Sequence, residues 1–154
     1  MIVWNRIDSR LIHGQVIEAW LPHLDVRRLV VADDEAAGDA LAKAAFGLVV
    51  PPEVEVLTTP VDDTDFQAMA RDRVRTLVLF RTVENAVRAR AHGLPDGTLN
   101  VGNVHSAPGK TALTRSVYLD PGEKEALATL RSGGMNVVIQ AVPNEAPTSL
   151  PAQR

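Results

Sequence analysis

Short apolar runs recur about every 25 residues along this chain, and each is followed by a segment whose apolar residues have helical spacing. The predicted strands are residues 2–4, 29–32, 54–57, 76–80, 99–101, 117–119 and 136–139. The predicted helices begin near residues 16, 36, 62, 83 and 122. Units of this length connect parallel neighbours, so the pattern predicts an α/β fold: one doubly wound, mostly parallel sheet with helices on both faces. One of the two short last strands is a candidate for an antiparallel strand at the sheet edge.

The length of 154 residues fits a single domain with a sizeable core. We assign residues 1–142 to this domain, because every predicted strand and helix lies within that range. From residue 143 onward the chain holds three prolines and few apolar residues. Such a segment has little to bury, so residues 143–154 are expected to form a mobile C-terminal tail.

Composition argues against several classes of function. The net charge of −3 disfavours nucleic acid as the main partner, and the absence of cysteine excludes disulfides and thiolate zinc sites. No apolar run approaches the roughly 20 residues that cross a bilayer. Charge begins at Arg6, which is not typical of a signal peptide. We therefore expect a cytoplasmic protein whose association with a membrane, if any, comes through a partner.

The most informative stretch lies between the first predicted strand and the helix that follows it. It reads RIDSRLIHGQV over residues 6–16 and combines two arginines, an aspartate and a histidine. Loops at the carboxyl ends of parallel strands are where open α/β sheets bind ligands. Charges in a short buried connection also need partners or a ligand. The stretch is therefore a candidate site.

These residue types suit the handling of a phosphoryl group. Arg10 and Arg6 can each offer a planar fork of donors to phosphate oxygens. The amides of Gly14 and Gln15 would lie at a helix start, where unpaired N–H groups and the helix dipole favour an anion. His13 titrates near neutrality and can act as a nucleophile, with one tautomer held by the carboxylate of Asp8. The alternative is purely structural: a polar loop histidine beside arginines that pair with the aspartate.

The same eleven residues resemble the signature of the IIB subunit of the mannose/sorbose family of the bacterial sugar phosphotransferase system. Weaker similarities are DDE at 33–35, LNVG at 99–102 and Gly109-Lys110. The resemblance implies that His13 accepts a phosphoryl group from a histidine of a IIA partner. It also implies that the group passes to a sugar bound by membrane IIC and IID subunits, without a metal or other cofactor. Ser9 departs from the pattern, since the family often has a second aspartate there.

A second loop is expected to face the same crevice. Gly102, Asn103 and His105 follow the fifth predicted strand, and they would form a second phosphate-binding wall if that strand neighbours the first. Asn103 is a further departure, because a second glycine is common there in the family. An ordinary turn is an equally good interpretation of this loop. Gly109-Lys110-Thr111 resembles the end of a P-loop, but Val104 stands where that motif needs glycine.

Other classes remain as alternatives. The spacing of His13, His23, His92 and His105 does not suit a metal site. A non-transporting regulatory or anion-binding module with the same fold is the main alternative to a phosphoryl carrier. A metal-free phosphatase is less well supported, because the loop lacks a second acid that could serve as general acid. The chain is compatible with an oligomer, and the sequence does not specify the sugar.

Overall fold

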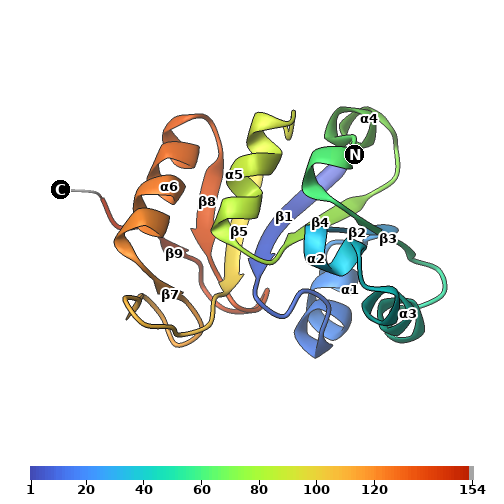
Figure 1. The fold of residues 1–154 in the computed structure, drawn as a ribbon, viewed down its shortest axis with the longest axis horizontal. Helices are drawn as coiled ribbons and strands as arrows, with labels where there is room; N and C mark the ends of the chain where they lie inside the picture. Colours follow the sequence, from blue (N-terminus) through green and yellow to red (C-terminus); the bar gives the residue numbers. More distant parts are fainter. Residues whose placement is uncertain (153–154) are drawn as a thin grey trace.

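The computed structural model describes residues 1–152. Within this range, seven strands form one sheet in the order β3-β2-β4-β1-β5-β8-β9, and two short strands, β6 and β7, form a separate antiparallel pair. The bounds are β1 Ile2–Asp8, β2 Arg28–Ala32, β3 Glu55–Thr59, β4 Thr76–Phe80, β5 Thr98–Asn103, β6 Thr111–Ala112, β7 Tyr118–Leu119, β8 Asn136–Ile139 and β9 Thr148–Ser149. The first six strands of the sheet order run parallel, and β9 pairs antiparallel with β8. The predicted fold class is confirmed (Figure 1).

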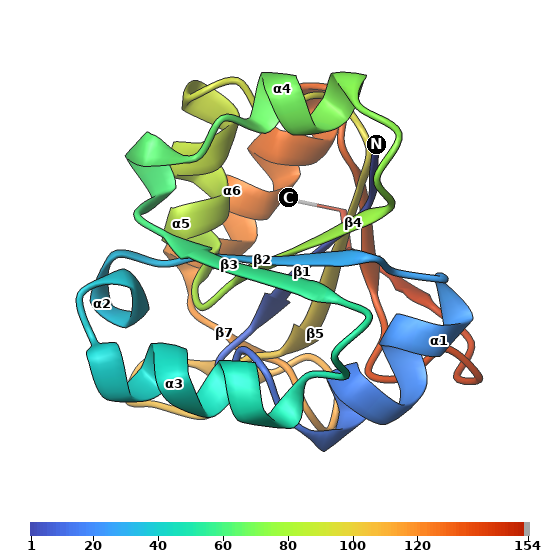
Figure 2. The same cartoon turned by 90° about the vertical axis from the view of Figure 1, so that its right-hand side faces the viewer.

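Helices cover both faces of this sheet. They are α1 Leu21–His23, α2 Asp34–Ala37, α3 Ala40–Val49, α4 Phe66–Arg71, α5 Val83–Ala91 and α6 Pro121–Ser132, with a π-helical turn at Val16–Trp20 and a 3-10 turn at Val61–Asp63. Figure 2 shows α4, α5 and α6 on one side of the sheet and α1 and α3 on the other. Among the described residues, no helix is long and apolar enough to cross a membrane.

Two hydrophobic cores result from this layering, one on each face. Along β4, Val78 and Phe80 enter the core beneath α5 and α6, whereas Leu77 and Leu79 enter the core beneath the first helix. Successive strand residues point to opposite faces, so a strand buried on both sides needs a continuous apolar run. That requirement explains why TLVLF is apolar after its first residue and buried throughout.

Several elements differ from their predicted extents. β2, β3 and β5 differ by one or two residues, and the helix predicted from residue 62 begins as α4 at Phe66, after the 3-10 turn. The first strand continues to Asp8, so Arg6 lies in a strand and not in a loop. The helix predicted from residue 36 is two helices, because Asp39 caps a new start after Gly38. The strand predicted at 117–119 exists only as β7, outside the main sheet. For the split helix a polar cap interrupts the apolar run, whereas for β7 the pairing with β6 decides its place.

The C-terminal segment docks on the sheet, which differs from the expectation of a mobile tail. Thr148–Ser149 forms the antiparallel edge strand β9, and Leu150 is 4% exposed within the core beneath α6. The Leu150 carbonyl accepts a hydrogen bond from Arg131 at 2.8 Å. Leu150 is a single apolar residue in a proline-rich segment and shows no periodicity, so the sequence did not indicate that it is buried. Residues 153–154 lie outside the described range.

Candidate phosphoryl-transfer site

The site begins inside β1, the strand between β4 and β5. Ile7 pairs with Phe80 on one side and Val101 on the other, so the carboxyl ends of all three strands meet. The helix after β1 lies on one face. On the opposite face lie α5, which follows β4, and α6, which follows β5 after the β6–β7 pair. Where the connections from neighbouring strands lead to opposite faces of the sheet, a crevice opens at the carboxyl ends of those strands. The loop from Ser9 to Gly14 therefore occupies the usual ligand position of an open α/β sheet.

Asp8 lies at the end of β1 and is the centre of a buried polar cluster. Its Oδ2 atom is 2.7 Å from Nε2 of His13 and accepts a hydrogen bond from Nε of Arg6 at 3.2 Å. Its Oδ1 atom accepts the backbone N–H of Arg10 at 2.9 Å. The Asp8 side chain is fully buried. A buried carboxylate is stable only with such donors, so this aspartate and its donors must fold as a unit.

The contact with Asp8 assigns the proton on His13. An ionised carboxylate can only accept a hydrogen bond, so the 2.7 Å contact places the imidazole proton on Nε2. Nδ1 then holds the free lone pair. The His13 side chain is 12% exposed, so the ring is fixed on one side and open on the other. This arrangement can present a neutral imidazole nitrogen to an electrophile.

Backbone geometry places His13 at the start of the first helix. Leu11 adopts a left-handed conformation with φ of +57° and is buried, and its N–H donates to the Asp8 carbonyl at 3.0 Å. Such a conformation is costly for a leucine and is found mostly where the surrounding structure enforces it. The first helical hydrogen bond runs from Ile17 to the His13 carbonyl at 3.1 Å. The amides of Gly14 and Gln15 precede that bond and have no intrahelical acceptor.

Arg6 occupies a different place from the one predicted. Its side chain is 0% exposed, so the guanidinium has no surface at which it could hold a phosphate in this structure. Nη1 donates to Asn100 at 2.6 Å and to the Gln140 carbonyl at 3.2 Å. Nη2 is 3.1 Å from the Asp8 carboxylate, close enough for an ion pair though not aligned for a hydrogen bond. Burial lowers the pKa of Arg6, and Asp8 acts in the opposite direction.

Gly102 provides the space for this buried arginine. A Cβ atom on Gly102 would lie 2.0 Å from Cζ of Arg6 and 2.2 Å from its Nη1. The guanidinium also lies over the ring of Trp20, 5.2 Å from the ring centroid. The sequence suggested that Gly102 supplies a backbone donor to phosphate. The structure instead gives it a steric role, because the guanidinium packs where a side chain would be.

The second predicted loop does meet the first. The N–H of Ser9 donates to the Asn103 carbonyl at 2.8 Å, and the N–H of His105 donates to the Ser9 hydroxyl at 3.1 Å. Ser9 therefore joins the two loops through hydrogen bonds on both its backbone and its side chain. The His105 residue is exposed. Its imidazole is free to face a ligand or a partner at the same edge.

Besides His105, three predicted site residues on the His13 loop remain open to solvent. Arg10, Gly14 and Gln15 are exposed, and a Cβ on Gly14 would meet nothing within 4 Å. Among the described residues, no ion pair or hydrogen bond holds the Arg10 guanidinium. The two arginines of the motif thus have unlike surroundings: Arg6 is enclosed and paired, and Arg10 is exposed.

Two residues of the buried polar cluster around Asp8 were not predicted from the sequence. Asn100 binds Arg6 through Oδ1, and its Nδ2 donates to the Gln140 carbonyl at 2.9 Å. An asparagine inside the apolar run of β5 was the available signal, because a buried amide needs partners. The Gln140 carbonyl lies just after β8. It is a backbone group, so no residue type in the sequence indicates its role. Backbone acceptors of this kind are visible only in the fold.

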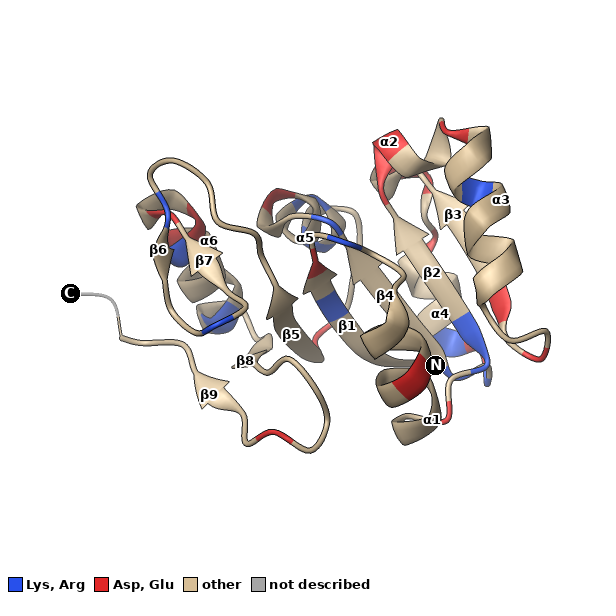
Figure 3. Cartoon of the chain, turned by 90° about the horizontal axis from the view of Figure 1, so that it is seen from below, with Lys and Arg blue, Asp and Glu red and all other residues tan. Residues whose placement is uncertain are grey.

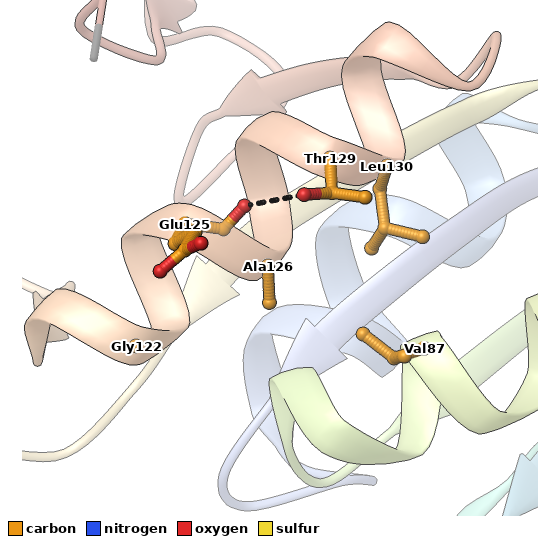
Figure 4. Close-up of a pocket in the computed structure, with 6 residues that line it drawn as sticks. All are labelled: Val87, Gly122, Glu125, Ala126, Thr129 and Leu130. Carbon is orange, nitrogen blue, oxygen red and sulfur yellow. Dashed lines mark hydrogen bonds between the residues drawn. The ribbon is translucent and has the colours of Figure 1, made fainter. Parts of the chain in front are cut away.

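Other concave surfaces lie away from this loop. A groove of about 280 Å³ between α5 and α6 is lined by Val87, Gly122, Glu125, Ala126, Thr129 and Leu130 (Figure 4). None of these residues belongs to the His13 loop or to β5. In the part of the chain that the structure describes, no group of three or more His, Asp or Glu side chains is placed to hold a metal ion.

Comparisons with known proteins agree with the sequence resemblance. The family model described as PTS system sorbose subfamily IIB component matches residues 2–152. The chain is 32% identical over 148 residues to the N-acetylgalactosamine-specific phosphotransferase enzyme IIB component 2 of Escherichia coli K12, covering 94% of this chain and 92% of the relative. It is 31% identical over 141 residues to the mannose-specific EIIAB component of the same organism, covering 89% of this chain and 43% of that protein.

A solved structure has the same fold over nearly the whole chain. The crystal structure of the N-acetylgalactosamine-specific IIB component 1 from Escherichia coli superposes with a TM-score of 0.91 and 27% sequence identity. The match covers 98% of this chain and 100% of the other. The fold, the family match and the relatives therefore point to the same group of proteins.

Proposed function

Because the chain belongs to the sorbose subfamily of IIB components of the sugar phosphotransferase system, and is thus a phosphotransferase component, we propose that it carries the phosphoryl group on His13. The donor would be a phosphohistidine of a IIA partner. The acceptor would be a hydroxyl of a sugar bound by membrane IIC and IID subunits. The observation that carries this proposal is the 2.7 Å contact between His13 and Asp8, which leaves Nδ1 with a free lone pair.

In the proposed transfer, Nδ1 of His13 attacks phosphorus as the bond from phosphorus to the donor imidazole breaks. The electron pair of that bond returns to the donor ring. Asp8 stabilises the positive charge that develops on the His13 ring through its contact with the Nε2 proton. In the second step a sugar hydroxyl attacks phosphorus and gives its proton to water or to a base on the membrane subunits. The His13–phosphorus bond breaks, and its electron pair returns to Nδ1. One phosphohistidine replaces another in the first step, so that step should be nearly thermoneutral.

Groups at the loop surface would hold the phosphoryl oxygens. The exposed Arg10 can offer a planar pair of donors, and the amides of Gly14 and Gln15 offer N–H groups at the helix start. His105 and Asn103 would form the opposite wall, joined to the loop through Ser9. The burial of Arg6 supports a positioning role. Arg6 would hold Asp8, and Asp8 would hold the His13 ring, while Arg6 itself would not contact phosphate.

Partners and location follow from the same proposal. A IIA partner is supported by the mannose-specific relative, whose name joins the A and B components in one chain and of which this chain covers 43%. The GalNAc-specific and mannose-specific relatives have nearly equal identity, 32% and 31%, yet are named for different sugars. We therefore assign sugar selection to the membrane subunits. The protein would act in the cytoplasm and reach the membrane through those subunits.

The test is transfer from a labelled donor. The protein is incubated with the IIA domain of the mannose-specific relative, phosphorylated with ³²P. Label that stays on this chain supports the carrier. Release of free phosphate would indicate a hydrolase, and failure to accept label from any IIA domain of the family would indicate a regulatory module. In the labelled protein, ¹⁵N NMR of the histidine ring should assign phosphorus to Nδ1, and attachment to Nε2 would contradict the role given to Asp8.

A further inference from the structure

The outer surface of α3 is an apolar patch without a partner in the fold. The helix reads ALAKAAFGLV over Ala40–Val49, and none of its residues is buried. Leu41, Leu48 and Val49 are 80%, 86% and 51% exposed. These are three of the five exposed large hydrophobic residues found in the described chain. Figure 3 shows the helix in tan apart from one band of basic colour, which is Lys43.

Folding does not require this outer surface. Asp39 caps the helix by accepting the N–H groups of Leu41 and Ala42 at 3.0 and 3.1 Å. Phe46 packs against the core from the inner side, and prolines follow at 51 and 52. Exposing leucines gains nothing for the isolated domain, and contiguous exposed apolar patches usually mark interaction surfaces. We define the α3 patch as Leu41, Ala44, Ala45, Leu48 and Val49.

We propose that the α3 patch binds the same patch on a second copy of this chain. Leu41, Ala44, Ala45 and Leu48 follow the i, i+3, i+4, i+7 spacing of a single helical stripe. In an antiparallel pair related by a two-fold axis, Leu41 lies against Leu48 of the partner subunit, and the alanines meet at the axis. Such a stripe is complementary to itself, as an isologous interface must be. Small residues at its centre let the two helices approach closely.

Charge disfavours a membrane as the occupant. Between residues 33 and 55, Lys43 is the only basic residue beside five exposed carboxylates, of which Asp34 pairs with Arg88; the sixth, Asp33, is buried and pairs with Arg81. Helices that lie on membranes carry basic residues along their polar face, because anionic lipids attract them. The acidic surroundings of α3 would be repelled by such lipids. The α3 patch carries almost no charge, so it fits a protein surface that is equally uncharged. The α3 patch of a second copy is such a surface.

The size of the patch limits the strength of this association. Ten helical residues extend for only about 15 Å, so α3 alone provides much less than the roughly 800 Å² per partner of a standard stable interface. The dimer should therefore be weak and depend on protein concentration. Its stripe lies on the face opposite α5 and α6, at the β3 end of the sheet (Figure 2).

A single-cysteine variant tests the proposal, because the native chain has no cysteine. Ala45→Cys places one thiol at the predicted two-fold axis. Ala91→Cys, at an exposed alanine on α5, is the matched control. Under mild oxidation we expect disulfide-linked dimer to form about tenfold faster or more at position 45, since the interface raises the effective thiol concentration. Equal rates for the two variants would overturn the proposal.

A second measurement does not depend on crosslinking. In sedimentation equilibrium up to about 1 mM protein, the parent chain should show an apparent mass that rises with concentration, as a weak dimer requires. Leu48→Glu should keep the monomer mass throughout and retain the native circular dichroism spectrum. A parent chain that stays monomeric, or a Leu48→Glu variant that dimerises equally well, would contradict the two-fold stripe. Preferential binding of the parent chain to anionic vesicles would identify a membrane surface instead.

Discussion

Substitution of Gly102 by alanine tests the buried cluster without touching His13 or Asp8. The new methyl group would lie 2.0 Å from Cζ of Arg6, far inside contact distance. The backbone at Gly102 is not in the left-handed region, so alanine introduces no strain there by itself. The guanidinium must therefore leave its site, or the strand must move. Either change separates Arg6 from Asp8, Asn100 and the Gln140 carbonyl.

The expected cost follows from the burial of both charges. Arg6 and Asp8 are each 0% exposed, and breaking a buried ion pair leaves an uncompensated charge, at a cost of about 3–5 kcal/mol. That is a large part of the roughly 5–15 kcal/mol that stabilises a typical domain. Misplacement of Asp8 should also free the His13 ring, so the rate of phosphoryl acceptance should fall together with stability.

Urea denaturation measures this cost, and two comparisons isolate its cause. The midpoint should fall by roughly 2 M for a domain with an ordinary m-value. Gly14→Ala is the matched control, because a Cβ there meets nothing within 4 Å, and it should stay close to the parent. In an Arg6→Met background the Gly102→Ala change should cost less than about 1 kcal/mol, since no guanidinium remains to be displaced. A Gly102→Ala variant that matches the parent, or that costs the same in both backgrounds, would show that the methyl group does not displace Arg6.

Three further predictions concern the tail, acid stability and the exposed arginine. Leu150→Ala should lower the free energy of unfolding by about 2–4 kcal/mol, because the side chain is buried in the core; an unchanged urea midpoint would mean that the tail does not dock. Hydrogen bonds from Arg28 and then from the amino group of Met1 lower the pKa of Asp72 below its ordinary value of 3.8, so the stability it contributes is present above about pH 4 and is lost as the pH falls further. Asp72→Asn should therefore flatten the dependence of unfolding free energy on pH in the acid range, and a profile as steep as the parent's would contradict this. Arg10→Lys keeps the charge but loses the planar fork, so stopped-flow phosphoryl transfer should slow roughly tenfold or more with stability unchanged, and parental rates would exclude the proposed contact.

The sequence predicts the layered fold because parallel strands covered on both faces must be continuously apolar. β4 and the helix α5 coincide with their predicted bounds, since TLVLF and the threonine cap before Val83 leave little ambiguity. β9 and β7 were harder to place. Each is two residues long, and pairing with a neighbour, not local pattern, makes them strands.

The contact between Asp8 and His13 was predictable from the sequence, but the arrangement of the residues around it was not. The motif brought Asp8 and His13 together correctly, and the structure joins them at 2.7 Å. Arg6 was assigned to a loop because the apolar run that indicated the first strand ends at Trp4. Its burial depends on Gly102, Asn100 and Gln140, which are far away in sequence and meet it only through the sheet order. Contacts between strands of that kind cannot be inferred from local spacing.

The most direct test of the central claim is the position of the phosphoryl group. The protein is phosphorylated by a IIA domain, kept at alkaline pH and analysed by mass spectrometry, with His13→Gln as the control. We expect phosphate on His13 alone, stable in alkali and lost in acid, as a phosphorus–nitrogen bond requires. His13→Gln should take up no label while its circular dichroism spectrum stays native, because the change removes no side chain from either hydrophobic core. Phosphate on His105 or Ser9, or labelling that persists in His13→Gln, would contradict the account.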